Sequence, residues 1–176
     1  CGNADTCDQI IYVIDDEAPK LACEDLRYEC DELPKEWPTP SALDNCDQNP
    51  VVTLLSTGDT TQGACPQRYY FTLTWEAKDE CGNADTCLQT VYVIDTTAPV
   101  VQCPPDTLME CDELPPGKLA DLIPPGGGWP FGTPSATDNC DPNPEIVAFL
   151  VGVHGEYPCQ YYFNIGYYAV DSCGNV

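Results

Sequence analysis

Residues 81–94 read CGNADTCLQTVYVI, and residues 1–14 read CGNADTCDQIIYVI. Other segments also recur in the same order: CGN again at 173–175, CDELP at 30–34 and 111–115, and WPTPSALDNCDQNP at 37–50 against WPFGTPSATDNCDPNP at 129–144. Self-similarity in the same order, at offsets of about 80 to 90 residues, is the signature of repeated structural units. The sequence therefore predicts a tandem array.

Two similar joints set the phase of the repeat. Asp15-Asp16-Glu17-Ala18-Pro19 and Asp95-Thr96-Thr97-Ala98-Pro99 each follow an apolar, strand-like run. Proline favours extended backbone before it and resists strand pairing, as expected between domains. We expect residues 1–15 to be the last strand of a preceding repeat and residues 16–95 a complete repeat. Residues 96–176 would then form a second repeat that lacks its final strand.

Cysteine content indicates the compartment. The chain has 13 cysteines among 176 residues, one histidine and no CxxC motif. Structural zinc sites usually need close Cys or Cys/His pairs, so disulfides explain these cysteines better. Disulfides persist in oxidising compartments, and we expect a secreted, cell-surface protein.

Charge and apolar patterning exclude several classes of function. Acids outnumber bases 29 to 6, for a net charge of −23, which argues against nucleic acid and anionic membrane surfaces as partners. The longest apolar run, Ile146–Val153, is too short to span a bilayer. No nucleophile–base pair or phosphate-binding loop is evident, so we expect neither an enzyme nor a cofactor.

Secondary structure is predicted to be almost entirely β. Apolar residues alternate with polar ones from Tyr69 to Ala77, and the second copy repeats this period of two at 161–169. Short strands separated by Pro and Gly turns are typical of a β-sandwich.

These residues carry a family resemblance. The order AP-x₃-C, then ALDNC or ATDNC, then W-x-A-x-D-x-CGN-x₃-C and V-x-V-I-D resembles hyalin (HYR) repeats. DNCDxNP and CDELP are similar to the cysteine-rich repeats of large surface adhesins in gliding Bacteroidota. The resemblance implies tandem, elongated, immunoglobulin-like β-sandwiches that are disulfide-bonded, with an adhesive role at the cell surface.

The immunoglobulin-like topology implied by the resemblance suggests disulfides within each repeat. Its strand order brings Cys23 to Cys87 and Cys46 to Cys81, and leaves Cys30 to pair with Cys65. The second repeat would form Cys111–Cys159 and Cys140–Cys173. Cys1 and Cys7 would then bond to cysteines of the preceding repeat, and Cys103 to an equivalent of Cys87 in the final strand that the second repeat lacks.

Two kinds of ligand or modification site are expected. Asp44, Asp47 and Asn49, with Asp79 from a neighbouring hairpin, offer hard oxygen ligands suited to Ca²⁺, although Asp and Asn also form local Asx turns. Because the resemblance points to Bacteroidota, the Asp-Thr pattern makes Thr60, Thr96 and Thr107 candidates for O-glycosylation.

Three functions remain open from the sequence. The first is a structural segment of an adhesin stalk or surface filament whose partners are neighbouring repeats. A second is a module that binds a glycan or protein, for which Trp37 and Trp129 are exposed-aromatic candidates, although a repeated Trp more often anchors a loop under its own domain. The third is an accessory repeat of a larger secreted enzyme.

Overall fold

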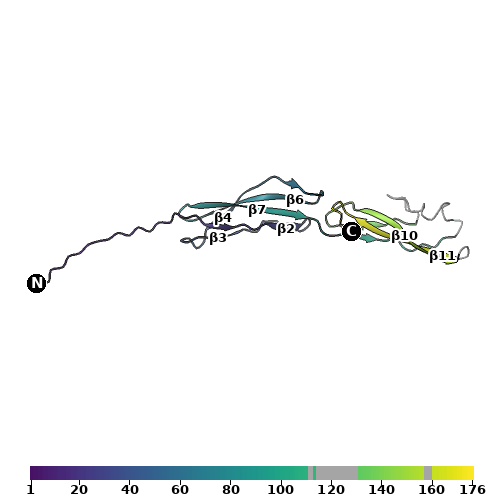
Figure 1. Ribbon diagram of the computed structural model, residues 1–176, viewed down its shortest axis with the longest axis horizontal. Helices are drawn as coiled ribbons and strands as arrows, with labels where there is room; N and C mark the ends of the chain where they lie inside the picture. Colours follow the sequence, from purple (N-terminus) through teal and green to yellow (C-terminus); the bar gives the residue numbers. More distant parts are fainter. Residues whose placement is uncertain (111–112, 114–130, 157–159) are drawn as a thin grey trace. The chain divides into compact units, whose positions relative to one another are not determined.

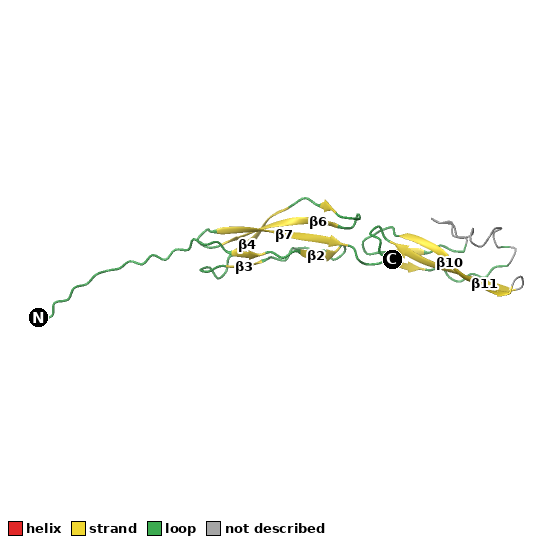
Figure 2. Cartoon of the chain, viewed as in Figure 1, coloured by secondary structure: helices red, strands yellow, loops and turns green. Residues whose placement is uncertain are grey.

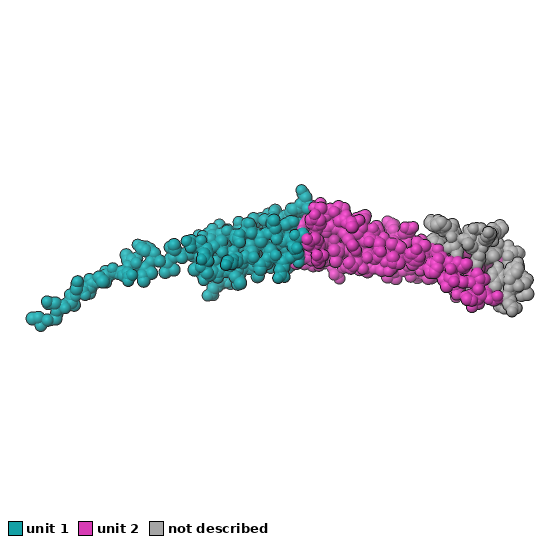
Figure 3. Space-filling view, in the orientation of Figure 1, with its two compact units in different colours: residues 1–25, 36–59, 72–90 teal, residues 26–35, 60–71, 91–176 magenta. Residues whose placement is uncertain are grey.

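The computed structural model describes residues 1–110, 113, 131–156 and 160–176. Every regular element in these ranges is a β-strand, which confirms the predicted all-β class (Figure 2). Within the same ranges, no helix is long and apolar enough to cross a membrane. Contacts group the residues into unit 1 (1–25, 36–59 and 72–90) and unit 2 (26–35, 60–71 and 91–176), coloured in Figure 3. The first predicted repeat contributes residues to both units.

The largest sheet has five strands in the order β2-β7-β6-β4, and a short fifth strand, β5, pairs with β6 (Figure 1). Strand β2 runs parallel to β7, whereas β4 and β5 run antiparallel to β6. The bounds of these strands are β2 Leu26–Glu29, β4 Val51–Thr57, β5 Thr61–Gln62, β6 Tyr69–Lys78 and β7 Ala84–Ile94.

Alternating side chains of β6 and β7 form the buried core. On β6 the buried residues are Phe71, Leu73, Trp75 and Ala77, at every second position as predicted from the sequence. On β7 the most buried side chains are Val91 and Val93, at 0% and 1% exposure.

One buried polar pair is fully hydrogen-bonded within this core. The Trp75 indole Nε1 donates to Gln89 Oε1 at 2.9 Å, and Gln89 Nε2 donates to the Glu24 carbonyl oxygen at 2.7 Å. Because a buried polar group without a partner is costly, this chain of bonds lets Gln89 lie at 4% exposure.

Three smaller sheets have two strands each. Strands β1 (Lys20–Ala22) and β3 (Ser41–Leu43) pair in the same antiparallel register as β8 (Val100–Gln102) and β9 (Ser135–Thr137). Strands β10 (Glu145–Glu156) and β11 (Gln160–Val170) form the third sheet, and like β4 and β6 they pair antiparallel with one register shift. Equivalent segments of the two sequence copies therefore form equivalent strand pairs.

Residues 1–19 contain no strand. Their apolar run, Ile10 to Ile14, has 73–89% of its side-chain area exposed. The same sequence pattern forms β7 in the first repeat, where every second side chain is buried.

Candidate metal centre and the disulfides around it

Three disulfides are present in the described residues: Cys23–Cys87, Cys30–Cys140 and Cys65–Cys173. Cys23–Cys87 is the predicted pair. The other two correct the sequence-based assignment, because the structure does not form the predicted Cys30–Cys65 and Cys140–Cys173 pairs. Both observed bonds instead join residues on opposite sides of the predicted boundary at 95/96, and all four cysteines belong to unit 2.

Strand direction explains the corrected pairing. Because β2 runs parallel to β7 and Glu29 pairs with Ile94, Cys30 follows β2 where Asp95 follows β7. Cys65 reaches the same end of β7, since nearby Arg68 donates two hydrogen bonds to the Asp95 carbonyl oxygen, from Nε at 3.2 Å and from a terminal nitrogen at 2.6 Å. Both cysteines thus lie where the chain leaves the first repeat.

A side-chain hydrogen bond accompanies each of these two disulfides. Beside Cys30–Cys140, Asn139 Nδ2 donates to Asp31 Oδ1 at 2.9 Å. Beside Cys65–Cys173, the Ser172 hydroxyl lies 2.9 Å from Gln67 Oε1. The covalent links are therefore part of a wider polar contact within unit 2.

Cys46 and Cys81 are free and exposed, so the predicted Cys46–Cys81 bond is also corrected. Their loops are nevertheless joined, because the Glu80 amide donates to Asp47 Oδ2 at 3.1 Å. Partial desolvation and the Asp15 carboxylate raise the pKa of both thiols. Three further cysteines are also free and exposed: Cys1, Cys7 and Cys103. The predicted Cys111–Cys159 pair lies outside the described residues.

Three aspartates gather at the start of the first repeat. Carboxylate oxygens of Asp15, Asp44 and Asp79 lie within 4.8 Å of one another. Two of these, Asp44 and Asp79, belong to the predicted calcium set. The other two predicted ligands are Asp47 and Asn49. Asp47 accepts the backbone amide of Asn49 at 2.8 Å with one oxygen and that of Glu80 with the other, so its carboxylate stabilises the turn.

An equivalent cluster combines the last residue of the first sequence copy with two residues of the second. Carboxylate oxygens of Asp95, Asp138 and Asp171 also lie within 4.8 Å of one another. The set predicted from the sequence drew on residues 44–49 and the hairpin of Asp79, and it left out Asp15 and this second cluster. The signal was present in the repeat, since aspartate occupies all three matching columns in both copies.

The same turn presents the middle aspartate of each triad. Asp44 Oδ1 accepts the amides of Cys46 and Asp47 at 2.9 and 2.7 Å. Asp138 Oδ1 accepts the amides of Cys140 and Asp141 at 2.8 and 2.7 Å. These bonds form the Asx turn that the sequence offered as the alternative to a calcium site. The turn uses only one oxygen of each carboxylate.

The CGN motif holds the third aspartate in place. Asn175 donates to Asp171 Oδ1 from its amide at 2.8 Å and to Oδ2 from its side chain at 2.6 Å, while the same Nδ2 lies 3.2 Å from the Asp95 carbonyl oxygen. Asn83 makes the same three bonds to Asp79 and Asp15. The glycine between Cys and Asn has φ of +87° at Gly174, a conformation that favours glycine.

Burial and mutual repulsion disfavour three ionised carboxylates in the second triad. Asp95 is fully buried, with 0% exposure. Burial, followed by repulsion from Asp171, Asp138 and Glu29, raises the pKa of the Asp95 carboxyl. In the first triad, burial and the carboxylates of Asp44 and Asp79 likewise raise the pKa of Asp15.

The candidate glycosylation sites are all exposed. Thr60, Thr96 and Thr107 lie at the surface. Thr96 is already engaged, because its amide and its hydroxyl both donate to the Glu29 carboxylate. O-glycosylation of these residues stays a prediction.

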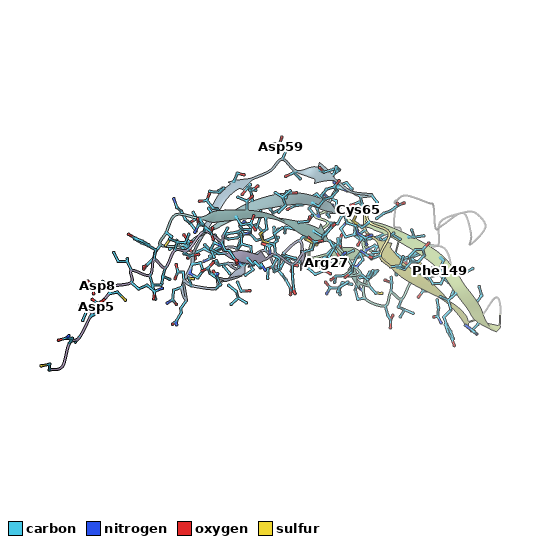
Figure 4. The ribbon with its side chains drawn as sticks, turned by 60° about the vertical axis from the view of Figure 1, so that its left-hand side comes forward. Asp5, Asp8, Arg27, Asp59, Cys65 and Phe149 are labelled. Carbon is cyan, nitrogen blue, oxygen red and sulfur yellow. A yellow bond between two sulfur atoms is a disulfide. The ribbon has the colours of Figure 1, made fainter. Side chains whose placement is uncertain are left out.

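An aromatic cluster covers part of β6 and β7. Tyr70, 40% exposed, lies with its ring centroid 5.9 Å from that of Tyr92. The Arg27 guanidinium, labelled in Figure 4, lies 4.6 Å from the Tyr92 ring centroid. The exposed Tyr70 ring, beside the partly buried Tyr92 and a cation, could stack against a ligand.

A comparison of the chain with protein-family models and with curated proteins finds no match.

Proposed function

We propose that this chain is a structural segment of an extracellular adhesin stalk or surface filament. It would consist of tandem immunoglobulin-like β-sandwich repeats of the hyalin-like type, with boundaries at 15/16 and 95/96. The observation that carries this proposal is the pair of disulfides Cys30–Cys140 and Cys65–Cys173. Each joins a cysteine of the first sequence copy to one of the second.

Two covalent cross-links are what a shaft under tension needs at a joint. Without them, only the single peptide chain at residues 95–99 would connect the copies, and the domain packing at the joint could separate under force. With them, tension passes through three covalent connections. The three disulfides also support an oxidising, extracytoplasmic location.

The free cysteines extend the scheme to further repeats. In the sequence repeat, Cys46 and Cys81 occupy the positions of Cys140 and Cys173. Their turns have the same hydrogen bonds as the turns of the bonded pair. We infer that Cys46 and Cys81 bond to the Cys30-type and Cys65-type cysteines of a preceding repeat.

Two further free cysteines fit the same columns of the repeat. Cys7 and Cys103 match Cys87 and Cys23, so each would form a disulfide of the Cys23–Cys87 type. The exposed run from Ile10 to Ile14 would be the β7 strand of the preceding repeat, which would bury its alternate side chains.

Single-molecule pulling tests this function. When all bonds are intact, tension between Cys23 and Cys173 bypasses most of the chain through Cys23–Cys87 and Cys65–Cys173. Only about 22 residues, from Cys65 to Cys87, are then free to extend, for roughly 75 Å at most. After reduction about 150 residues extend, for roughly 500 Å. An extension of the larger size without reductant would contradict the proposal.

A second candidate is a glycan- or protein-binding module, which the cluster of Tyr70, Tyr92 and Arg27 favours. Stacking on an exposed aromatic ring beside a cation is a common mode of ligand contact. Binding to a glycan array that disappears in Tyr70→Ala, with melting unchanged, would support this function instead.

A further inference from the structure

The buried polar atoms that lack a hydrogen-bond partner are concentrated in the two aspartate triads. Within the described ranges, three buried side-chain oxygen or nitrogen atoms have no hydrogen-bond partner: Asp44 Oδ2, Asp95 Oδ2 and Asp138 Oδ2. All three belong to the two aspartate triads. Native proteins satisfy nearly all buried polar atoms, so atoms left in this way call for a bound group.

Asp95 is the most deeply buried of the aspartates that have an unpartnered oxygen. Its side chain is fully buried, and one oxygen lacks a partner while two more carboxylates lie within 4.8 Å. Leaving a charged group buried without compensation is costly, and three such charges together also repel one another. The Arg68 guanidinium beside them donates to the Asp95 backbone carbonyl. A cation among the carboxylates would satisfy both the orphaned oxygens and the charge.

We propose that Asp95, Asp138 and Asp171 bind a calcium ion, and that Asp15, Asp44 and Asp79 bind a second one in the same way.

The donor set selects the type of cation. Carboxylate oxygens are hard ligands that suit Ca²⁺ or Mg²⁺, whereas zinc and copper favour nitrogen and sulfur. Beside the second triad, Cys140 and Cys173 are already bonded to Cys30 and Cys65, so neither offers a thiolate to a softer metal. Calcium accepts six to eight oxygens in flexible geometry, so three carboxylates leave room for water, while Mg²⁺ requires a near-ideal octahedron.

The fold presents the ligands on three separate segments. Asp95 follows β7, Asp138 precedes Cys140 in the turn after β9, and Asp171 follows β11 and precedes Cys173. An ion here would cross-link the same segments that the two disulfides join. Its role in stiffening a stalk rests on the proposed function, but ion binding itself does not.

Equilibrium binding of Ca²⁺ to the chelator-treated full chain tests the proposal. The expected result is two saturable ions per chain, one after Asp138→Asn, one after Asp44→Asn and none in the double variant. Asp59→Asn provides a matched control, because it removes the same charge from an exposed residue labelled in Figure 4 and should retain both ions. The binding is measured with excess NaCl to suppress diffuse attraction to the net charge of −23.

Three results would overturn the proposal. One is unsaturable binding by the wild-type chain that all variants share equally. Another is two saturable ions retained in the double variant. The third is equal affinity for Mg²⁺ and Ca²⁺ at both sites. If circular dichroism shows that Asp138→Asn is unfolded, Asp95→Asn replaces it, because its backbone carbonyl keeps the bonds from Arg68. These outcomes do not depend on the disulfide pairing, so they are distinguishable from failure of the stalk proposal.

Discussion

Removing the Cys65–Cys173 disulfide should destabilise unit 2 by an amount set by the loop that it closes. The two cysteines are 108 residues apart, but Cys30–Cys140 already shortens that path in the unfolded chain. The shortest remaining route also uses Cys23–Cys87: it has about 22 residues from Cys65 to Cys87, about 7 from Cys23 to Cys30 and about 33 from Cys140 to Cys173. A loop of about 62 residues corresponds to about 4 kcal/mol in the chain-entropy account of disulfides.

The assay is thermal unfolding of Cys65→Ala/Cys173→Ala under oxidising conditions. For a chain of this length, a loss of about 4 kcal/mol lowers the melting temperature by roughly 8–16 °C. The matched control is Cys46→Ala/Cys81→Ala, which changes the equivalent positions, where both thiols are free, and should melt within roughly 2 °C of the wild type.

Reduction provides the second control. In a strong reductant the wild type and Cys65→Ala/Cys173→Ala should converge, because neither then has a cross-link at these positions. The reasoning is refuted if the variant melts with the wild type under oxidising conditions. It is also refuted if the Cys46→Ala/Cys81→Ala control loses as much stability as Cys65→Ala/Cys173→Ala.

Three further outcomes are expected from single substitutions. In EDTA, Asp138→Asn should melt at or above the wild-type temperature, because it removes one charge from three mutually repelling carboxylates. In Ca²⁺ the variant should melt below the wild type, because it loses a ligand of the ion. A lower melting temperature in both media would count against a bound ion. Gln89→Ala should cost about 1–3 kcal/mol in denaturant titration because it leaves the buried Trp75 N–H unpaired, and a neutral result would dismiss that bond. Gly174→Ala, at φ +87°, should cost about 1 kcal/mol in the same titration, whereas Gly2→Ala, which has open space around it, should cost nothing measurable.

The sequence predicted the strands well because their signal is local. Alternation from Tyr69 to Ala77 reports directly which face of β6 is buried, and the structure buries that face. The pair Cys23–Cys87 was also accessible, since both cysteines lie on segments that the implied topology brings together.

The other disulfides could not be assigned in the same way. A repeat shows which cysteines are equivalent, but it does not show whether Cys30 bonds within its own copy or to the next. That choice depends on the parallel pairing of β2 with β7, which places Cys30 at the end of the strand that leads into the joint. No local pattern in the sequence reports this pairing.

The residues predicted to bind calcium overlap the observed aspartate cluster at two positions, Asp44 and Asp79, and the limited overlap has a related reason. Asp44, Asp47 and Asn49 are close in sequence, yet the structure assigns Asp47 to backbone amides. The third member of the triad, Asp15, is separated from them by 29 residues or more along the chain, and only a comparison of its column in the repeat with Asp95 could have identified it.

Non-reducing peptide mapping by mass spectrometry, with free thiols alkylated first, distinguishes disulfides between the two sequence copies from disulfides within one copy. We expect one cross-linked peptide that contains Cys30 and Cys140 and another that contains Cys65 and Cys173. A peptide linking Cys30 to Cys65 within one copy would contradict the claim that successive repeats are covalently joined.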